Sequence, residues 1–149
     1  MTAQIPQGGF FITKKTSGSI EPIRADLEAS GFQTRCIPED NVLLASLNSF
    51  QGQGLWSCEQ GGLSYDLDLS NTAQLKSMTG YSQDNAGGLI WALYKKYDQA
   101  FIEKLKGAFA FAIWDQVEKK MIVATDYYGI KPVVWHQKGD NFTAAGRIK

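Results

Sequence analysis

The run GAFAFAIWD at residues 107–115 constrains the fold more than any other part of the chain. Its large residues Phe109, Phe111 and Ile113 alternate with alanines. This alternation is typical of a β-strand that is buried on both faces, with the alanine face packed closely against another layer. The rest of the chain therefore has to cover both sides of this strand.

The surrounding sequence predicts helices and strands that supply this cover. The first patterns indicate a strand at 10–13 and then a helix that begins after an N-cap at Ser19, carries Ile20, Ile23 and Leu27, and stops at Gly31. Short strands are predicted within 42–69, followed by a helical turn at 71–78. A long helix is predicted from Asn85 to Leu105, with a break at Asp98. After the buried strand, MIVATD and VVW are predicted to complete a three-stranded antiparallel meander. Two sheets stacked between helical layers, an α+β architecture, follow from this order of elements.

The charge balance excludes one class of partner. The chain of 149 residues has 15 Lys and Arg against 15 Asp and Glu, so its formal net charge is zero. Nucleic-acid binding draws on an excess of basic residues, so we expect no nucleic acid as a partner. No apolar run approaches the roughly 18–20 residues of a membrane span, and the N-terminal segment lacks the order of charged and apolar residues of a signal peptide. We therefore expect a cytoplasmic protein with no membrane partner.

Cysteine and histidine are too few for a metal centre of the Cys/His type. Cys36 and Cys58 have no zinc spacing, and His136 is the single histidine. A Ser-His-Asp triad would depend on His136, whose place at the end of an apolar run favours a strand-end side chain. We expect neither a metal site nor a triad. The two cysteines are compatible with one disulfide or with two reduced thiols, and the sequence leaves this choice open.

Residues 101–149 resemble the second half of the glutamine amidotransferase domain of the asparagine synthetase family. In that family a helix ending in Leu-x-Gly is followed by a strand of the type GxFAFAxWD, a second strand, a DxxGxKPL turn and a closing FxxSEIK segment. The chain matches these motifs at Leu105, Gly107, Phe109 to Asp115, Asp126, Gly129, Lys131, Pro132, Phe142, Ile148 and Lys149. The order and spacing of the motifs together make the resemblance specific.

The resemblance implies a particular architecture, the four-layer α/β/β/α sandwich of N-terminal nucleophile hydrolases, with two stacked, mostly antiparallel sheets. It also implies that residues 1–149 form a single amidotransferase-like domain, either truncated at its C-terminus or standing alone. The matching residues have structural roles of their own, because glycines and Pro132 suit turns and the aromatic residues suit a core. Asp126 and Lys131 are expected to form a local ion pair within their turn rather than a site.

The catalytic elements of the family would lie in the first half of the chain, where the sequence departs from the family pattern. A family glutaminase begins with a Cys whose own α-amine serves as its base. Here Gln7, Gly8 and Gly9 precede the first strand. The family's Arg-Gly-Pro-Asp segment, whose Arg would hold the glutamine carboxylate bidentately, is absent after the first helix. Arg35 is the candidate in its place.

Two further family elements are replaced. The Asn-Gly-Glu segment that would supply the oxyanion hole falls on residues 66–68, Asp-Leu-Asp. An anionic side chain there would raise the barrier, whereas a neutral amide donor lowers it by roughly 3–4 kcal/mol. The acidic segment that would bind the substrate amine falls on residues 85–88, with Asp84 as the nearest carboxylate. Loss of four elements together predicts a pseudoenzyme with no assigned catalytic residue, whose substrate-binding candidates are Arg35, Asp66 and Asp84.

Thr2 is the alternative nucleophile. Removal of the initiator Met would leave the Thr2 hydroxyl beside its own α-amine, which is a working arrangement in this class of hydrolases. Residues 3–9 separate Thr2 from the first strand, so the hydroxyl would lie on a tail unless that tail folded back. An active N-terminal nucleophile amidohydrolase using Thr2 is therefore the alternative to a non-catalytic domain.

Some ATP-dependent amide-forming ligases, such as β-lactam synthetases and lasso-peptide cyclases, resemble asparagine synthetase but have an amidotransferase-like domain without the Cys. Similarity to this group implies a scaffold or companion of such a ligase. The chain has no pyrophosphate loop of the Ser-Gly-Gly-x-Asp-Ser type, so we expect no cofactor in it and place ATP and Mg²⁺ in an associated synthetase domain. The expected partner is that synthetase domain or another protein, with a homodimer or a stand-alone protein-interaction module as alternatives.

Overall fold

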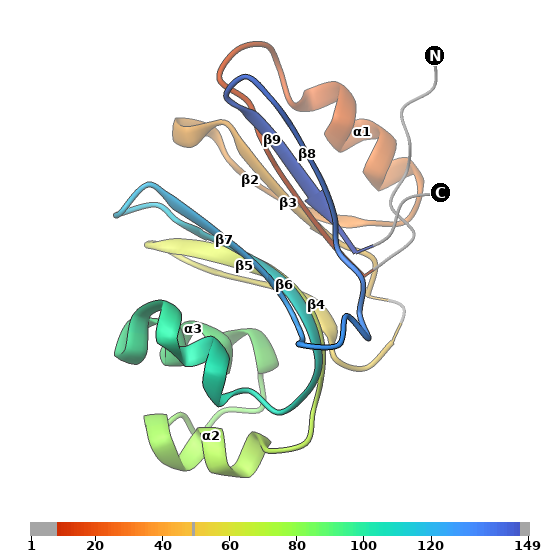
Figure 1. The fold of residues 1–149 in the computed structure, drawn as a ribbon. Helices are drawn as coiled ribbons and strands as arrows, with labels where there is room; N and C mark the ends of the chain where they lie inside the picture. The colour runs from red at the N-terminus through yellow and green to blue at the C-terminus, as the bar shows by residue number, and fades with distance from the viewer. Residues whose placement is uncertain (1–8, 49, 147–149) are drawn as a thin grey trace.

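Two antiparallel β-sheets lie face to face in the computed structural model, which describes residues 9–48 and 50–146 (Figure 1). In spatial order, the first sheet consists of β2 (Gln33–Ile37), β3 (Val42–Ser46), β1 (Phe10–Lys14), β9 (Asn141–Ala145) and β8 (Val134–Lys138). The second sheet consists of β4 (Gln53–Cys58), β5 (Gly61–Leu69), β6 (Gly107–Asp115) and β7 (Lys120–Thr125). All neighbouring strands in both sheets run antiparallel.

Helices cover the outer face of each sheet (Figure 1). Helix α1 (Glu21–Ala29) lies on the first sheet, and helices α2 (Thr72–Thr79) and α3 (Ala86–Tyr97) lie on the second. Two 3₁₀ helices, η1 (Pro38–Asp40) and η2 (Asp98–Lys104), complete the elements. The predicted α+β class and the four-layer α/β/β/α sandwich are confirmed. Within the described part of the chain, no helix is long and apolar enough to cross a membrane.

Strand β6 is buried on both faces, as its alternation predicts. Phe109 and Phe111 pack into the core beneath α2 and α3, whereas Ala110 and Ala112 face the first sheet in a separate core between the sheets. Every residue from Phe109 to the end of the strand is buried. Because alanine has a small side chain, the first sheet can approach β6 closely on that face.

Helix α1 ends where its sequence indicates. Gly31 has a φ of 93°, in the left-handed region that favours glycine, and the Phe32 N–H donates to the Leu27 carbonyl at 3.0 Å. This hydrogen bond is typical of a Schellman motif. The side chains of Leu27 and Phe32 belong to the same hydrophobic core. At the other end the N-cap is Ile20 rather than the predicted Ser19, although the Ser19 hydroxyl still accepts a hydrogen bond from an N–H of the first turn.

Helix α3 begins beside the predicted Asn85 but ends at Tyr97, and the predicted continuation to Leu105 is a 3₁₀ helix. The Asn85 side chain caps it by accepting a hydrogen bond from the Gly88 N–H at 3.0 Å. Asp98 has a φ of 53°, which is outside the helical region, and the chain continues from there as η2. The break predicted at Asp98 is therefore confirmed.

The structure corrects the predicted three-stranded meander. Strands β6 and β7 pair in the second sheet, but β8 pairs with β9 in the first, so residues 126–133 cross from one sheet to the other. Apolar residues in a strand specify which face is buried but not the sheet to which that face belongs, so a meander and a crossover have the same local pattern. The sequence also did not predict β2, a half-exposed edge strand.

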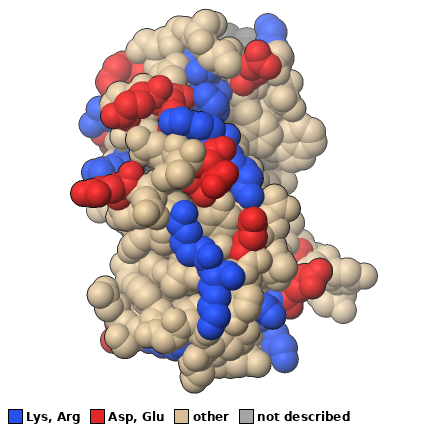
Figure 2. All heavy atoms as spheres, turned by 90° about the vertical axis from the view of Figure 1, so that its left-hand side faces the viewer, with Lys and Arg blue, Asp and Glu red and all other residues tan. Residues whose placement is uncertain are grey.

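Charged side chains of both signs mix on the face that carries the β6–β7 hairpin (Figure 2). At this hairpin, Lys119 pairs with Asp40, and the Lys120 Nζ lies 3.0 Å from a carboxylate oxygen of Asp98. The Lys120–Asp98 pair is exposed and adds little to stability. Positive and negative side chains therefore alternate at this end of the sandwich, and no large area of the described surface carries charge of a single sign (Figure 2).

Replacing Phe111 by alanine tests the burial of the helix-facing side of β6. Phe111 is fully buried and its ring stacks on those of Phe101 and Phe109. The Phe111→Ala variant is therefore expected to lose about 3–5 kcal/mol of unfolding free energy. Phe50→Ala is the matched control because the Phe50 side chain is 73% exposed, and its expected change is within ~0.5 kcal/mol. Urea titration measures both, and a loss below ~1 kcal/mol for Phe111→Ala would contradict the burial.

Candidate functional site

Several loops meet at one end of the sandwich, which we call the β1 end. Strand register places the start of β1 beside the ends of β3 and β9. The connection from β3 to β4, residues 47–52, joins this end of the first sheet to the second. There, Asp66 of β5 and Thr125 at the end of β7 both lie opposite Ala110 of β6. Segments far apart in the sequence are thus brought together at the β1 end.

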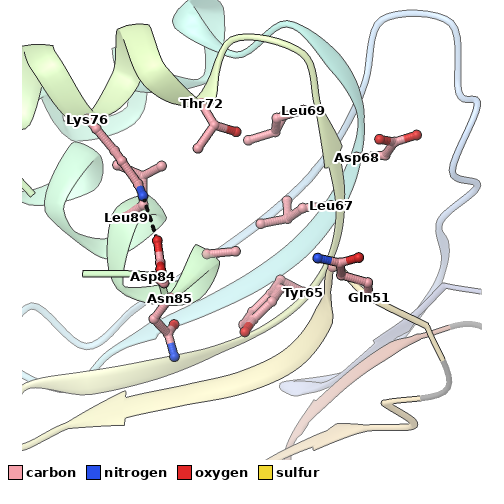
Figure 3. A pocket seen from close by; sticks show the side chains of 12 residues that line it. Gln51, Tyr65, Leu67, Asp68, Leu69, Thr72, Lys76, Asp84, Asn85 and Leu89 are labelled. Atoms are coloured by element: carbon pink, nitrogen blue, oxygen red, sulfur yellow. Dashed lines mark hydrogen bonds and ion pairs between the residues drawn. The ribbon is translucent and has the colours of Figure 1, made fainter. Parts of the chain in front are cut away.

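A cavity of about 630 Å³ opens between β5 and the starts of α2 and α3 (Figure 3). Its lining residues are Gln51, Gly52, Tyr65, Leu67, Asp68, Leu69, Thr72, Lys76, Asp84, Asn85, Ala86 and Leu89. The Lys76 Nζ lies 3.1 Å from a carboxylate oxygen of Asp84 across the rim. The volume falls within the range of pockets that hold small molecules.

The close approach of α3 to the second sheet shapes this cavity. A side chain at Gly87 has no room, because its Cβ would lie 2.5 Å from the Cβ of Trp56 and 2.6 Å from the Tyr65 ring. The Tyr65 hydroxyl instead accepts a hydrogen bond from the Gly87 N–H. Gly87 therefore lets the start of α3 lie directly on β4 and β5, and Gly88 leaves room for the side chain of Tyr81.

Asp66 lies on the opposite face of β5, where its charge is compensated. One carboxylate oxygen is 3.0 Å from the Lys131 Nζ, and the other accepts a hydrogen bond from the Gln53 side-chain amide at 3.2 Å. Both charged side chains are largely buried, with exposed fractions of 17% for Asp66 and 27% for Lys131. The carboxylate thus forms a compact ion pair beside the cavity, whose lining includes its neighbours Tyr65 and Leu67.

The buried carboxylate of Asp126 organises the segment that carries Lys131. It accepts hydrogen bonds from the N–H groups of Ile130 at 2.8 Å, Lys131 at 3.1 Å and Phe109 at 3.2 Å. Burial alone would raise the pKa of Asp126, but these donors outweigh it and hold the pKa below its usual value. The predicted local ion pair between Asp126 and Lys131 is therefore wrong, because Asp126 binds backbone groups and the Lys131 ammonium reaches Asp66 instead.

The structure does not bring the predicted site residues together. Asp84 lines the large cavity, whereas Asp66 lies on the other face of β5 and is not among the residues that line it. Arg35 lines a second cavity of about 300 Å³ at the β2 and β4 edge and is not among the residues around the larger one. Thr2 lies outside the described residues. The roles proposed for Arg35, Asp66, Asp84 and Thr2 remain predictions.

The sequence did not predict Lys76 and Lys131 as site residues. A weak signal for Lys131 lies in the DxxGxKP turn, whose conformation fixes where its lysine points, but the partner on β5 is not visible in a local pattern. The described residues contain no group of three or more His, Cys, Asp or Glu side chains arranged to hold a metal ion.

The two cysteines are free thiols in the structure. Cys36 packs against the core under α1, whereas Cys58 packs against the core under α3, on the outer face of the other sheet. Burial raises the pKa of the Cys36 thiol, which lowers its thiolate fraction at neutral pH. Neither thiol lines the larger cavity.

Sequence comparison relates this chain to amidotransferase domains. Residues 51–149, which include β4 to β9 and the large cavity, match the family model of the glutamine amidotransferase domain. The chain is similar to glutamine-hydrolyzing asparagine synthetase 1 of Bacillus subtilis, with 27% identity over 68% of this chain and 16% of that protein. It is similar to asparagine synthetase 3 of the same organism, with 32% identity over 57% of this chain and 15% of that protein. Amidase chry2 of Gibberella zeae is 34% identical over 61% of this chain and 14% of its own length.

These relatives are much longer proteins. The regions that match this chain make up only 14%, 15% and 16% of their lengths.

Replacing Asp126 by asparagine tests the turn at the β1 end. The Asp126→Asn variant is expected to lose about 1–3 kcal/mol at pH 7, because an amide cannot accept the same three N–H groups as a carboxylate. A lowered folded-state pKa means that the carboxylate stabilises the fold above the unfolded Asp pKa of about 3.9 and loses this effect as the pH falls through the folded value. The difference between wild type and variant should therefore shrink at pH 3 relative to pH 7 in urea titrations.

The matched control for this experiment is Asp84→Asn, because the Asp84 side chain is fully exposed. Its change in unfolding free energy should stay within ~0.5 kcal/mol at both pH values. An Asp126→Asn loss that is equal at pH 3 and pH 7 would contradict a stabilising ionised carboxylate.

Proposed function

This chain belongs to the glutamine amidotransferase domain family of asparagine synthetase-like proteins, and from that premise we propose that it is a non-hydrolysing scaffold or companion of an ATP-dependent amide-forming ligase. In this proposal the domain keeps the amidotransferase fold, while the amine used by the ligase comes from its substrate. Adenylation by ATP and Mg²⁺ takes place on a synthetase domain that accompanies the chain.

The observation that carries the proposal is the ion pair between Asp66 and Lys131. The resemblance assigns the Asp66 position to a neutral amide that would donate to the oxyanion of the glutamine carbonyl. Negative charge develops on that oxygen during hydrolysis, so a carboxylate in its place opposes the reaction. The Lys131 ammonium is held at 3.0 Å by this carboxylate, so the pair presents no preorganised neutral donor.

The groups that would bind glutamine support the same proposal. A bidentate arginine is suited to an α-carboxylate, but Arg35 lines a different cavity. The cation on the rim of the large cavity is Lys76, which is a point charge and pairs with Asp84. Cys36 and Cys58 lie on outer faces of the two sheets, away from that cavity.

The names of the relatives support a ligase as the setting. Two of them are glutamine-hydrolyzing asparagine synthetases, and the regions matching this chain form only 15% and 16% of their lengths. Most of each relative is therefore available for other domains. We place the ligase in the cytoplasm, where two free thiols stay reduced.

The proposal predicts that the purified protein releases no ammonia from glutamine above background. Cys36→Ala and Cys58→Ala should leave this result unchanged, because neither thiol has an adjacent α-amine to take its proton. Glutamine-hydrolyzing asparagine synthetase 1 of Bacillus subtilis serves as the positive control in the same coupled ammonia assay. Glutamine turnover that disappears in Cys36→Ala would overturn the proposal.

A second measurement decides between the scaffold and a hydrolase that uses Thr2. The protein is incubated with an electrophilic glutamine analogue and examined by peptide mass spectrometry. Unmodified protein is the expected result, since a covalent adduct requires an activated nucleophile beside a carboxamide pocket. An adduct mapped to Thr2, absent from Thr2→Val, would establish the amidohydrolase alternative.

A further inference from the structure

The second cavity, of about 300 Å³, lies at one side of the sandwich, between the edge strands of the two sheets. Strand β2 is the outermost strand of the first sheet, and β4 is the outermost strand of the second. The 3₁₀ helix η1, the turn after β4 and the β6–β7 hairpin also contribute to the lining, through Glu39, Glu59 and Gln116. The cavity is distinct from the larger one, because the two share no lining residue.

Arg35 brings a positive charge onto the inner face of the first sheet. It lies opposite Leu44 in the register of β2 and β3, and Leu44 belongs to the core between the sheets. Residues that lie directly opposite in an antiparallel pair share one face of the sheet. Ser57 of β4 lies on the inner face of the second sheet, two residues beyond Leu55, which packs against the same core. Both sheets therefore present a polar side chain to the second cavity.

Three charged side chains line the second cavity without neutralising one another. Among the described residues, the Arg35 guanidinium and the carboxylates of Glu39 and Glu59 take part in no ion pair and no side-chain hydrogen bond. By contrast, Arg24 pairs with two glutamates of its own helix, α1. Unpaired charges of both signs that converge on one cavity remain available to the polar groups of a ligand.

The charges of the second cavity specify the kind of ligand. One guanidinium and two carboxylates are complemented by a ligand that carries one carboxylate and two cationic groups. The planar guanidinium of Arg35 can hold a carboxylate through two parallel hydrogen bonds. Glu39 lies at the end of β2, in the same layer as Arg35, whereas Glu59 follows β4 of the other sheet, and stacked sheets lie ~10 Å apart. The two cationic groups of the ligand must therefore be separated by a chain of several atoms.

We propose that the second cavity binds a basic amino acid of the lysine type. Its α-carboxylate binds Arg35, its α-ammonium binds Glu39, and its side-chain ammonium reaches across to Glu59. At the ~30 Å³ that one water molecule takes, the cavity has room for about ten non-hydrogen atoms, which is the size of such an amino acid. Ile37 and Pro38 supply apolar surface for the methylene chain between the charged groups. This proposal is independent of the function proposed above.

Titration of the purified chain with L-lysine at low ionic strength, followed by amide NMR spectra, tests the proposal. Three charge-assisted contacts, each worth roughly tenfold, give an expected dissociation constant of about 1 mM. Two analogues separate the contacts. Norleucine keeps the α-groups and the carbon chain but lacks the side-chain ammonium, whereas cadaverine lacks the carboxylate. Each analogue should bind at least ~5-fold more weakly than lysine, because it loses one charged contact at the mouth of the cavity.

Single variants assign each contact to its residue. Glu59→Gln should reduce the preference for lysine over norleucine to less than ~2-fold, because the partner of the side-chain ammonium is gone. Arg35→Gln should weaken lysine and norleucine alike, by at least ~5-fold, and leave cadaverine unaffected. Glu103→Gln and Arg24→Gln are the matched controls, since both residues are exposed and lie outside the cavity, and they should leave all three affinities unchanged. Urea titration confirms that the variants keep the fold, which is expected because Arg35 and Glu59 are exposed.

Two results would overturn the proposal. The first is a lack of saturable lysine binding up to about 20 mM. Arg35 would then be an inward-pointing charge that protects the free edge of β2 from pairing with another chain. The second is a preference for lysine over norleucine that persists in Glu59→Gln.

Discussion

The close contact of the two sheets across the alanine face of β6 is the constraint on which the rest of the structure depends. Ala110 and Ala112 leave room for the first sheet, and the Ser64 hydroxyl links the layers by donating to the Ala45 carbonyl and accepting from the Phe11 N–H at 3.3 Å. The other face of β6 carries the phenylalanines that anchor the helices. Because both faces are committed, β6 can neither move to an edge nor shift its register by one residue.

Two buried aspartates hold the turns that follow β6 and β7. Asp115 at the end of β6 accepts hydrogen bonds from two N–H groups of the hairpin at 3.0 Å each and from the Tyr94 hydroxyl at 2.6 Å. Burial would raise the pKa of Asp115, but these donors and the Lys95 ammonium lower it, while burial and the nearby Asp115 carboxylate raise the pKa of Tyr94. At the end of β7, the Asp126 carboxylate likewise accepts hydrogen bonds from backbone N–H groups. After this turn the chain crosses to the first sheet. Lys131 of the turn pairs with Asp66, and Tyr127 and Tyr128 are exposed to solvent.

The candidate site could be predicted only in part. The alternation in LSYDLDL places Asp66 on the face of β5 opposite Tyr65 and Leu67, and the resemblance identifies Asp66 as a replacement for an amide. Its partner Lys131 lies on a segment whose path crosses between sheets, so no local spacing connects the two residues. Arg35 was chosen because an arginine can bind a carboxylate, but in the structure it lies on β2 and lines the second cavity.

By itself the sequence determined the features that depend on neighbouring residues. The two-sided burial of β6, the end of α1 at Gly31 and the break at Asp98 follow from side-chain alternation and backbone preference. The order of the elements indicated two sheets between helical layers, and the resemblance implied the same four-layer sandwich. Only the tertiary structure decided that β8 joins the first sheet, that Asp126 binds backbone groups, and that Lys131 compensates Asp66. The reason is physical: a local pattern specifies which face of an element is buried, whereas the partner of that face is chosen by the packing of segments distant in the chain.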